Sequence, residues 1–253
     1  MHSPFPPFAR LFSRKESLLT SGLLSGATDI HSHILPGADD GLQNYQEAVD
    51  TLQSLHSTGI RQLFLTPHIM SDLPDNTTYH LSEKFNRFTK QLENDGITNI
   101  PALKLGAEYM LEPAFNIRKE EGLLTFAGRH VLVETSYLTP PLGLDDFLDD
   151  LSDHAYIPIL AHPERYNYMD INDYEAFKTK KIKFQLNYLS LFGVYGKQVK
   201  TKAEHLLKES FYDFTGSDLH NFSFHHHWIT QKNLKKRHIH QLHPLFQNNR
   251  HLW

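Results

Sequence analysis

The sequence predicts an α/β fold in which parallel strands close into a barrel with slightly fewer strands than the eight-stranded standard. Three observations support this prediction. Short apolar runs recur along the 253 residues, most of them end in a polar residue, and stretches with helical periodicity lie between them. Such alternation is typical of βα units. The chain has no internal repeat and no linker that would divide it, so we expect one barrel domain.

Seven of the apolar runs have the length and composition of strands. They span residues 27–31, 62–66, 102–106, 130–134, 157–161, 183–187 and 212–216. Apolar residues with helical spacing occupy four stretches, residues 45–55, 85–92, 144–151 and 199–207. The order of these elements along the chain indicates a parallel sheet covered by helices.

The two ends of the chain differ from its centre. We expect residues 1–23 to form an N-terminal arm, because this segment is rich in proline and basic residues. Residues 24–253 would form the barrel domain, with a C-terminal helix and a loose, His-rich tail after residue 221. No apolar run approaches the roughly 20 residues that span a bilayer, and the N-terminus lacks the apolar centre of a signal peptide. A cytoplasmic protein without a transmembrane segment is therefore predicted.

The composition restricts the possible chemistry. The chain contains 18 histidines and no cysteine. Cysteine-based hydrolases, disulfides and zinc sites with thiolate ligands are therefore excluded. Any metal ion must be held by nitrogen and oxygen ligands. The net charge of -4 argues against a nucleic-acid-binding protein.

Histidines and carboxylates gather at the predicted ends of the strands, where parallel barrels build active sites. His31 and His33 lie two residues apart, so on a strand their side chains point the same way. Asp218 and His220 repeat this spacing. Nine candidate metal ligands share this placement: His31, His33, Asp40, His68, Glu108, Glu134, His162, Asp218 and His220. Nine side chains are too many for one ion and fit two or three, with zinc, manganese or iron as the metals.

Each candidate ligand alone has an ordinary explanation, since a single histidine or carboxylate is often a solvated residue at a strand edge. The placement of all nine candidates at the ends of predicted strands indicates a metal site. Closely spaced ions lower the pKa of a bridging water and bind both oxygens of an in-line displacement, so hydrolysis of phosphate esters is the predicted chemistry. We interpret the other histidines as surface residues; they include His56, His80, His154, His205, His225, His226, His227, His238, His240 and His243.

Taken together, these motifs resemble the polymerase and histidinol phosphatase (PHP) superfamily, and within it the bacterial protein-tyrosine phosphatases of capsular and exopolysaccharide regulation. The resemblance covers about residues 24–221. The motifs are Asp29-Ile-His31-Ser-His33, Asp39-Asp40-Gly41, Thr66-Pro-His68, Gly106-Ala-Glu108, Glu134, Ala161-His162-Pro-Glu-Arg165-Tyr166 and Ser217-Asp218-Leu-His220-Asn221. Relatives often carry two arginines just after the histidine that matches His68, whereas this chain has Ile69, Met70 and Ser71.

The resemblance implies a distorted (β/α)7 TIM-like barrel of the PHP fold, with two or three divalent ions, manganese foremost and iron or zinc as alternatives. The nine candidate ligands match the metal ligands of the family, and Arg165 matches an arginine that contacts phosphate. The implied substrate is a phosphotyrosine protein, namely a tyrosine autokinase that controls capsule or exopolysaccharide synthesis.

The predicted activity is that of a phosphoric monoester hydrolase. We expect a metal-bridging hydroxide to attack phosphorus without a phosphoenzyme, with Arg165 and His220 as catalytic residues. Tyr109, Tyr137 and Tyr166 are candidates to flank a tyrosyl ring, with core packing as the alternative. Two other functions stay open, a small-molecule phosphatase of the histidinol phosphatase type and a non-catalytic, metal-stabilised binding module. The net charge of -4 disfavours a nuclease.

Overall fold

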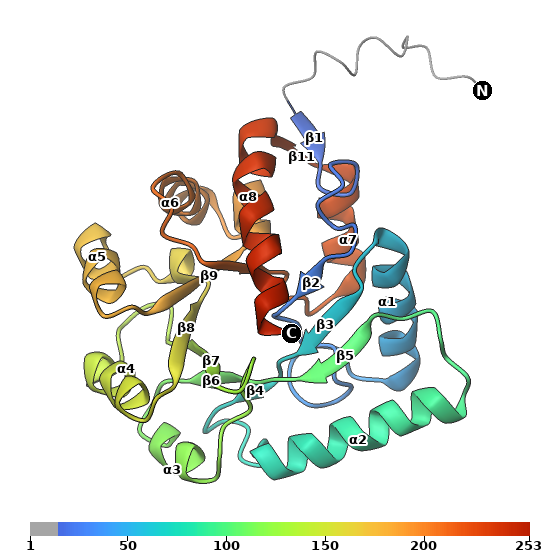
Figure 1. Cartoon of the computed structure of the whole chain (residues 1–253), viewed down its shortest axis with the longest axis horizontal. Helices are drawn as coiled ribbons and strands as arrows, with labels where there is room; N and C mark the ends of the chain where they lie inside the picture. Colours follow the sequence, from blue (N-terminus) through green and yellow to red (C-terminus); the bar gives the residue numbers. More distant parts are fainter. Residues whose placement is uncertain (1–14) are drawn as a thin grey trace.

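A ring of parallel strands forms the centre of the computed structural model, which describes residues 15–253. Six strands make one sheet in the order β10-β9-β8-β7-β6-β4, and three make a second in the order β2-β3-β5. β3 and β4 follow each other along one path, as do β5 and β6, so the nine strands occupy seven positions. The predicted α/β barrel of seven strand positions is therefore confirmed (Figure 1).

All neighbouring strands in the two sheets run parallel. Three of the predicted strands have the expected bounds, and the other four are shorter or interrupted. The barrel strands are β2 (Thr28–Asp29), β3 (Gln62–Leu65), β4 (His68–Ile69), β5 (Ala102–Leu105), β6 (Glu108–Met110), β7 (His130–Glu134), β8 (Ile157–Ala161), β9 (Lys183–Asn187) and β10 (Phe214–Gly216).

Short backbone contacts close the ring between its first and last strands. Ser32 forms a parallel bridge with Leu219, just beyond the ends of β2 and β10. The backbone N–H of His33 donates to the carbonyl oxygen of Leu219 at 2.9 Å, and that of Asp218 donates to the carbonyl oxygen of His31 at 2.9 Å. Two segments that each carry candidate ligands are therefore fixed side by side.

Helices surround the strand ring (Figure 1). The four predicted helical stretches are confirmed, and the segment predicted to form a C-terminal helix forms two. Within residues 15–253 the structure adds two further α-helices and three 3₁₀ helices. The α-helices are α1 (Tyr45–Thr58), α2 (Thr78–Asn94), α3 (Phe115–Glu120), α4 (Leu144–Asp153), α5 (Ile171–Thr179), α6 (Lys197–Lys208), α7 (Phe222–Gln231) and α8 (Lys236–Asn249). The 3₁₀ helices are η2 (Pro163–Arg165), η3 (Tyr188–Phe192) and η4 (Arg250–Leu252).

The ends of α1 illustrate how local sequence sets these bounds. The side chain of Asn44 accepts a hydrogen bond from the backbone N–H of Glu47 and so caps the first turn. Gly59 ends the helix with φ of 110°, in the left-handed region that glycine tolerates. Between these caps Val49, Leu52 and Leu55 pack their apolar face into the core.

Alternation along the strands separates two layers of the core. On β7, Val131 and Val133 belong to the large apolar core that includes residues of the surrounding helices, whereas Leu132 belongs to a second, smaller cluster. Glu134 lies on the same side of β7 as Leu132, because side chains alternate across a strand. The small cluster also contains Ile159 on the neighbouring β8. The carboxylate of Glu134 therefore lies at the end of a row of apolar side chains that belong to the small cluster.

The expectation of a loose C-terminal tail is wrong. α8 and η4 continue the fold to the last residues, and α8 ends close to the middle of the strand ring in Figure 1. The fully buried Asn249 donates from Nδ2 to the carbonyl oxygens of Thr28, at 2.8 Å, and Thr215, at 2.7 Å. Leu252 belongs to the small apolar cluster, against which Trp253 packs. This segment therefore stabilises the barrel.

Two further expectations concern the same region. His225 and His238 are buried, at 1% and 3% exposure, so their interpretation as surface residues is wrong. His226, His227, His240 and His243 are exposed, as expected. The amphipathic faces of α7 and α8 explain the difference, because one side of each helix is buried: α8 packs against β2 and β10, and α7 packs against β1 (Lys15–Ser17) and η3.

The division into an arm of residues 1–23 and a barrel domain of residues 24–253 stays a prediction. Residues 1–14 lie outside the described part of the chain. Within 15–23, β1 (Lys15–Ser17) pairs antiparallel with β11 (Asn233–Lys235), and Leu18 is fully buried. Across residues 15–253, no helix combines the length and the apolar character that a membrane crossing requires.

Candidate metal centre

The structure brings all nine predicted ligands together at the carboxyl-terminal end of the barrel strands. They form three overlapping groups in which the potential ligand atoms lie within 4.8 Å of one another. The groups are His31, Glu108, His162 and Asp218; His33, Asp40, His68 and His220; and His68, Glu108 and Glu134. Because His68 and Glu108 are each shared by two groups, the three groups form one cluster.

The first group is completely buried. Nε2 of His31 lies 3.1 Å from Oε2 of Glu108 and 3.4 Å from Oδ1 of Asp218. Nε2 of His162 lies 2.9 Å from Oε1 of Glu108. Two imidazoles and two carboxylates thus point toward a common centre from β2, β6, β8 and β10.

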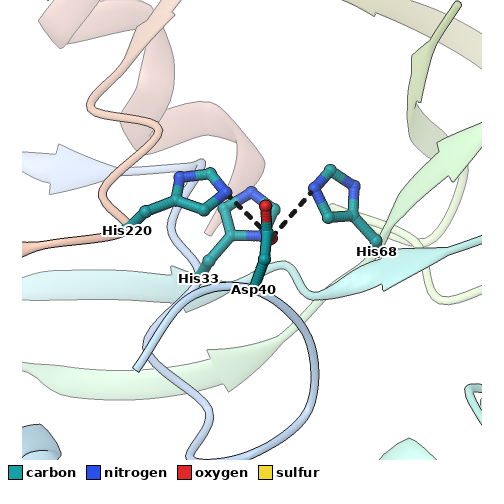
Figure 2. A group of neighbouring side chains, drawn as sticks. All are labelled: His33, Asp40, His68 and His220. Carbon is teal, nitrogen blue, oxygen red and sulfur yellow. Dashed lines mark ion pairs between the residues drawn. The ribbon is translucent and has the colours of Figure 1, made fainter. Parts of the chain in front are cut away.

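The second group lies nearer to solvent. Figure 2 shows the carboxylate of Asp40 between the imidazoles of His68 and His220, with the ring of His33 close to them. Oδ1 of Asp40 lies 3.6 Å from Nε2 of His68 and 3.3 Å from Nε2 of His220. The rings of His33 and His220 stack with their centroids 3.9 Å apart. The side chain of Asp40 is 73% exposed, so this group borders the entrance.

The third group contains atoms that need a positive partner. Nδ1 of His68 lies 2.9 Å from Oε1 of Glu134 and 3.2 Å from Oε2 of Glu108, but these three buried atoms have no hydrogen-bond partner with suitable geometry within residues 15–253. A buried carboxylate oxygen without a donor is unfavourable. A divalent cation accepts ligands of these types, so the residues present fit a metal centre.

Two glycines permit the close approach of the segments that carry the ligands. A Cβ atom on Gly41 would lie 1.9 Å from the carbonyl oxygen of His33, and one on Gly216 would lie 2.7 Å from Cβ of His31. His162 and Asp218 themselves have positive φ, 34° and 52°, which few residues other than glycine adopt. Such backbone strain is often found at functional sites.

Neighbouring side chains fix the orientation of two of the imidazoles. Oδ2 of Asp39 lies 2.7 Å from Nδ1 of His33 and accepts a hydrogen bond from the backbone N–H of His68 at 2.9 Å. Oε1 of Gln185 lies 3.0 Å from Nδ1 of His31. Each contact leaves Nε2 of the imidazole directed toward the cluster, as partners of metal-binding histidines usually do.

The cluster shifts the pKa values of its own members. Burial alone would lower the pKa of His31, but the charges of Glu108 and Asp218 outweigh burial and raise this pKa to about 9. Burial alone would raise the pKa of Glu108 and of Asp218, yet the positive charge of His31 and hydrogen bonds from nearby histidines hold both pKa values well below their usual range. Without an ion, protons on histidines therefore supply the positive charge that the carboxylates require.

A cavity of about 430 Å³ opens above the cluster. Asp40, His68, Glu108, Asp218 and His220 lie at one side of it, and Arg165 at another. Nη1 of Arg165 donates to Oδ2 of Asp218 at 2.7 Å. The remaining wall includes Tyr137, Leu189, Tyr195, Leu219 and Phe224. The cavity thus places an arginine and an apolar wall next to the candidate metal centre.

Of the three tyrosines considered from the sequence, only Tyr137 lines this cavity. Tyr109 and Tyr166 are fully buried, so core packing explains them. Sequence reasoning missed Tyr195, Gln185 and Asn187. A polar residue inside an apolar strand was the available signal for Gln185 and Asn187 on β9, whereas nothing in the local sequence distinguishes Tyr195.

Comparison with known proteins agrees with this geometry. Residues 27–240 match the family described as capsular polysaccharide synthesis, CpsB/CapC. The chain belongs to the CpsB/CapC family.

Two proteins similar to this chain come from different bacteria. Tyrosine-protein phosphatase YwqE of Bacillus subtilis is 29% identical over 198 residues, which are 76% of this chain and 77% of YwqE. Tyrosine-protein phosphatase CpsB of Streptococcus pneumoniae is 24% identical over 205 residues, 76% of this chain and 82% of CpsB. All nine candidate ligands and Arg165 lie within the residues that match the CpsB/CapC family.

The fold of the CpsB/CapC family is also known from crystals. A structure reported for YwqE of Bacillus subtilis and CpsB of Streptococcus pneumoniae, described as unique metal-dependent tyrosine phosphatases, superposes with a TM-score of 0.77. The superposition covers 89% of this chain and 93% of the other at 24% identity. The barrel architecture is therefore that of the family.

Proposed function

We propose that this protein is a metal-dependent protein-tyrosine phosphatase. One observation carries the proposal. Three groups of histidines and carboxylates are joined into one cluster by His68 and Glu108, and this cluster borders a cavity that Arg165 also lines. Family membership and the names of YwqE and CpsB support the same activity.

The nine candidate ligands would hold two or three divalent ions, with manganese as the proposed metal and iron or zinc as alternatives. When bound, such ions lower the pKa of a water molecule and neutralise charge on the transferred phosphoryl group. Asp39 and Gln185 keep the imidazoles of His33 and His31 aligned for this purpose.

The walls of the cavity are suited to a phosphorylated phenol. Arg165 offers N–H groups to the non-bridging phosphate oxygens, because within residues 15–253 its guanidinium group donates one hydrogen bond, from Nη1 to Asp218. Leu189, Leu219 and Phe224 offer apolar surface to an aromatic ring. Arg165 therefore orients the phosphate toward the cluster while the apolar wall accepts the side chain that carries it.

Departure of the phenol requires little assistance from the protein. A phenolate has a pKa of ~10, so it leaves more readily than an alkoxide. His220 lines the cavity, and its side chain is 31% exposed. We assign to His220 the transfer of a proton to the leaving oxygen. In this role its imidazole would be protonated and not bound to an ion, and the other eight candidates would hold the metal. Oδ1 of Asp40 lies 3.3 Å from Nε2 of His220.

The proposed substrate is a phosphotyrosine protein, and the proposed partner is a tyrosine autokinase that controls capsule or exopolysaccharide synthesis. The description of the CpsB/CapC family supports a role in capsular polysaccharide synthesis. The proposed location is the cytoplasm, where the autokinase would carry its phosphate.

The test compares phosphotyrosine peptides with histidinol phosphate across added manganese, iron and zinc, together with elemental analysis. We expect at least two equivalents of bound metal and a clear preference for the phosphotyrosine peptide. Replacing His31 and His33 by alanine should remove both metal and activity, while Asp153→Asn at the exposed end of α4 should change neither. Equal or faster turnover of the amino alcohol ester would identify a small-molecule phosphatase instead.

A further inference from the structure

The guanidinium group of Arg165 lies between two aromatic rings. Its Cζ atom is 4.3 Å from the ring centroid of Tyr137 and 4.3 Å from that of Tyr195. Both distances are within the range of a favourable interaction between a cation and the π face of a ring. The side chain of Arg165 is only 18% exposed, so water weakens these interactions little.

One edge of the same guanidinium group is also fixed. Nη1 of Arg165 donates to Oδ2 of Asp218 at 2.7 Å, and Nδ2 of Asn187 donates to the same oxygen at 3.1 Å. Oδ1 of Asp218 faces His31 at 3.4 Å, inside the candidate metal centre. The arginine is thus tied to the cluster through Asp218, and its remaining N–H groups are available to the cavity.

Tyr195 is itself held in place by a buried network. Its hydroxyl accepts a hydrogen bond from Nδ2 of Asn187 at 2.9 Å. The backbone N–H of Asn187 donates to Oε1 of Glu164 at 3.0 Å, and the hydroxyl of Ser190 donates to the same oxygen at 2.7 Å. Glu164 is 1% exposed. The segment that carries Tyr195 therefore has a fixed position over Arg165.

Tyr137 comes from a different part of the barrel, the loop that follows β7. Its ring packs against the fully buried ring of Tyr166, with centroids 6.1 Å apart and planes inclined by 22°. The two rings that enclose Arg165 are thus supported independently, one by Tyr166 and the other by Asn187. Both rings next to the guanidinium group therefore have fixed positions.

We propose that Tyr195 and Tyr137 are positioning residues that act through Arg165. By enclosing the guanidinium group they fix its plane, so that its free N–H groups meet the phosphate at the metal centre without prior rearrangement. This inference rests on the proposed function, in which Arg165 contacts the phosphate. The physical advantage is preorganisation: an arginine side chain has many rotamers, and the rings remove this freedom before substrate binds.

The test uses Tyr195→Leu, which removes the ring, and Tyr195→Phe, which keeps the ring and loses the hydroxyl. With a phosphotyrosine peptide and the metal-loaded protein, Tyr195→Leu should lower kcat/KM about tenfold, as expected for the loss of a partly desolvated cation–π contact. Tyr195→Phe should lower kcat/KM less than Tyr195→Leu does, because the ring stays while the hydrogen bond from Asn187 is lost. The affinity for inorganic phosphate, measured by titration calorimetry, should fall by a similar factor in Tyr195→Leu only.

A double-mutant cycle separates action through Arg165 from a general structural effect. In an Arg165→Ala background, the Tyr195→Leu change should alter kcat/KM less than about twofold, because the group that the ring positions is already absent. Added guanidinium ion at low millimolar concentration should partly restore activity to Arg165→Ala, and this rescue should weaken when Tyr195→Leu is also present. The same cycle with Tyr137→Leu gives an independent measurement if one variant is poorly folded.

Tyr156→Leu is the matched control, since this residue precedes β8 at the end opposite to His162. It should leave kcat/KM unchanged, and metal content and circular dichroism should match wild type in all variants that are compared. A fall in kcat/KM for Tyr195→Leu that is equally large with and without Arg165 would overturn the inference and leave the proposed function intact. If Arg165→Ala had no effect on kcat/KM, both the phosphate contact and the positioning role would fail.

Discussion

Oδ2 of Asp39 lies 2.7 Å from Nδ1 of His33, and both side chains are buried. The charge of His33 and hydrogen bonds from His33, His68 and Gly41 together outweigh the effect of burial, so the pKa of Asp39 is well below its usual value. Asp39 is therefore an anion that fixes the ring of His33 and increases the basicity of the nitrogen facing the cluster.

Asp39→Asn tests this relationship. The variant keeps the size of the side chain but removes the charge, and loss of such a partner typically weakens metal affinity about 10- to 100-fold. We expect activity at low metal concentration to fall and to recover when metal is added in excess. Titration with manganese measures the affinity. An unchanged affinity would show that Asp39 serves the local loop only.

Metal removal should affect stability as well as activity. Buried oxygens of Glu108 and Glu134 lack hydrogen-bond donors within residues 15–253, so a cation stabilises the folded state. Metal at about 100 times its dissociation constant contributes ~2.7 kcal/mol per site. Dialysis against a chelator should abolish turnover and lower Tm, and manganese should restore both. A chelated protein with full activity and unchanged Tm would contradict the metal centre.

Metal binding should become tighter as the pH rises toward 9. The pKa of His31 is raised to about 9 in the metal-free protein, so an ion must displace a proton below this pH. Protonated His31 stabilises the folded, metal-free protein. This stabilisation is fully present below pH ~6.5, the pKa of His31 in the unfolded chain, and is lost as the pH rises through about 9. Calorimetry in buffers of different ionisation enthalpy should detect proton release on binding at pH 7. No proton release would refute the prediction.

His225 should make the protein sensitive to acid. Burial lowers the pKa of His225 to about 3, and its ring lies 2.7 Å from the hydroxyl of Tyr188. Since the unfolded chain binds a proton near pH ~6.5 and the folded chain does not, stability falls as the pH decreases from ~6.5 toward 3, by up to about 1.4 kcal/mol per unit from this residue.

His225→Phe should flatten this dependence even if its stability at pH 7 is lower. Urea unfolding of wild type and variant at several values between pH 5 and pH 7 gives the two slopes. Parallel slopes would mean that the imidazole is protonated in the folded protein. His226→Phe, an exposed neighbour on the same helix, serves as the control and should retain the wild-type slope.

Leu252→Ala should destabilise the barrel by about 2–4 kcal/mol, because Leu252 is 1% exposed and completes the small apolar cluster. Leu142→Ala offers the same chemical change at a residue that is 98% exposed, and it should cost less than about 0.5 kcal/mol. Chemical unfolding of both variants measures the difference. Equal effects would show that the C-terminal segment is not part of the core.

The sequence was sufficient to predict that the nine candidate ligands lie together, because they lie at or beyond the ends of strands, and the carboxyl ends of parallel strands meet at one end of a barrel. It was also sufficient for the bounds of β7, β8 and β9. β3 and β5 were harder to predict in full, because each path is interrupted before it resumes as β4 or β6. The tertiary environment decides such interruptions.

Contacts between distant segments could not be predicted. Tyr195 reaches Arg165 only because Asn187 and Glu164 fix the intervening segment, and no local pattern encodes that meeting. The burial of His225 and His238 was missed for a similar reason, since a polar composition concealed the apolar faces of α7 and α8.

The bridge between Ser32 and Leu219, and the hydrogen bond from Asn249 to Thr28, also determine when the protein can become active. A ribosome releases residues 28–33 long before residues 217–252, so a growing chain displays its first histidines without the carboxylate and the seal that complete their surroundings. The candidate metal centre can therefore assemble only after residues 217–252 have been synthesised, since a chain that stops before Ser217 has neither the bridge to Leu219 nor the carboxylate of Asp218.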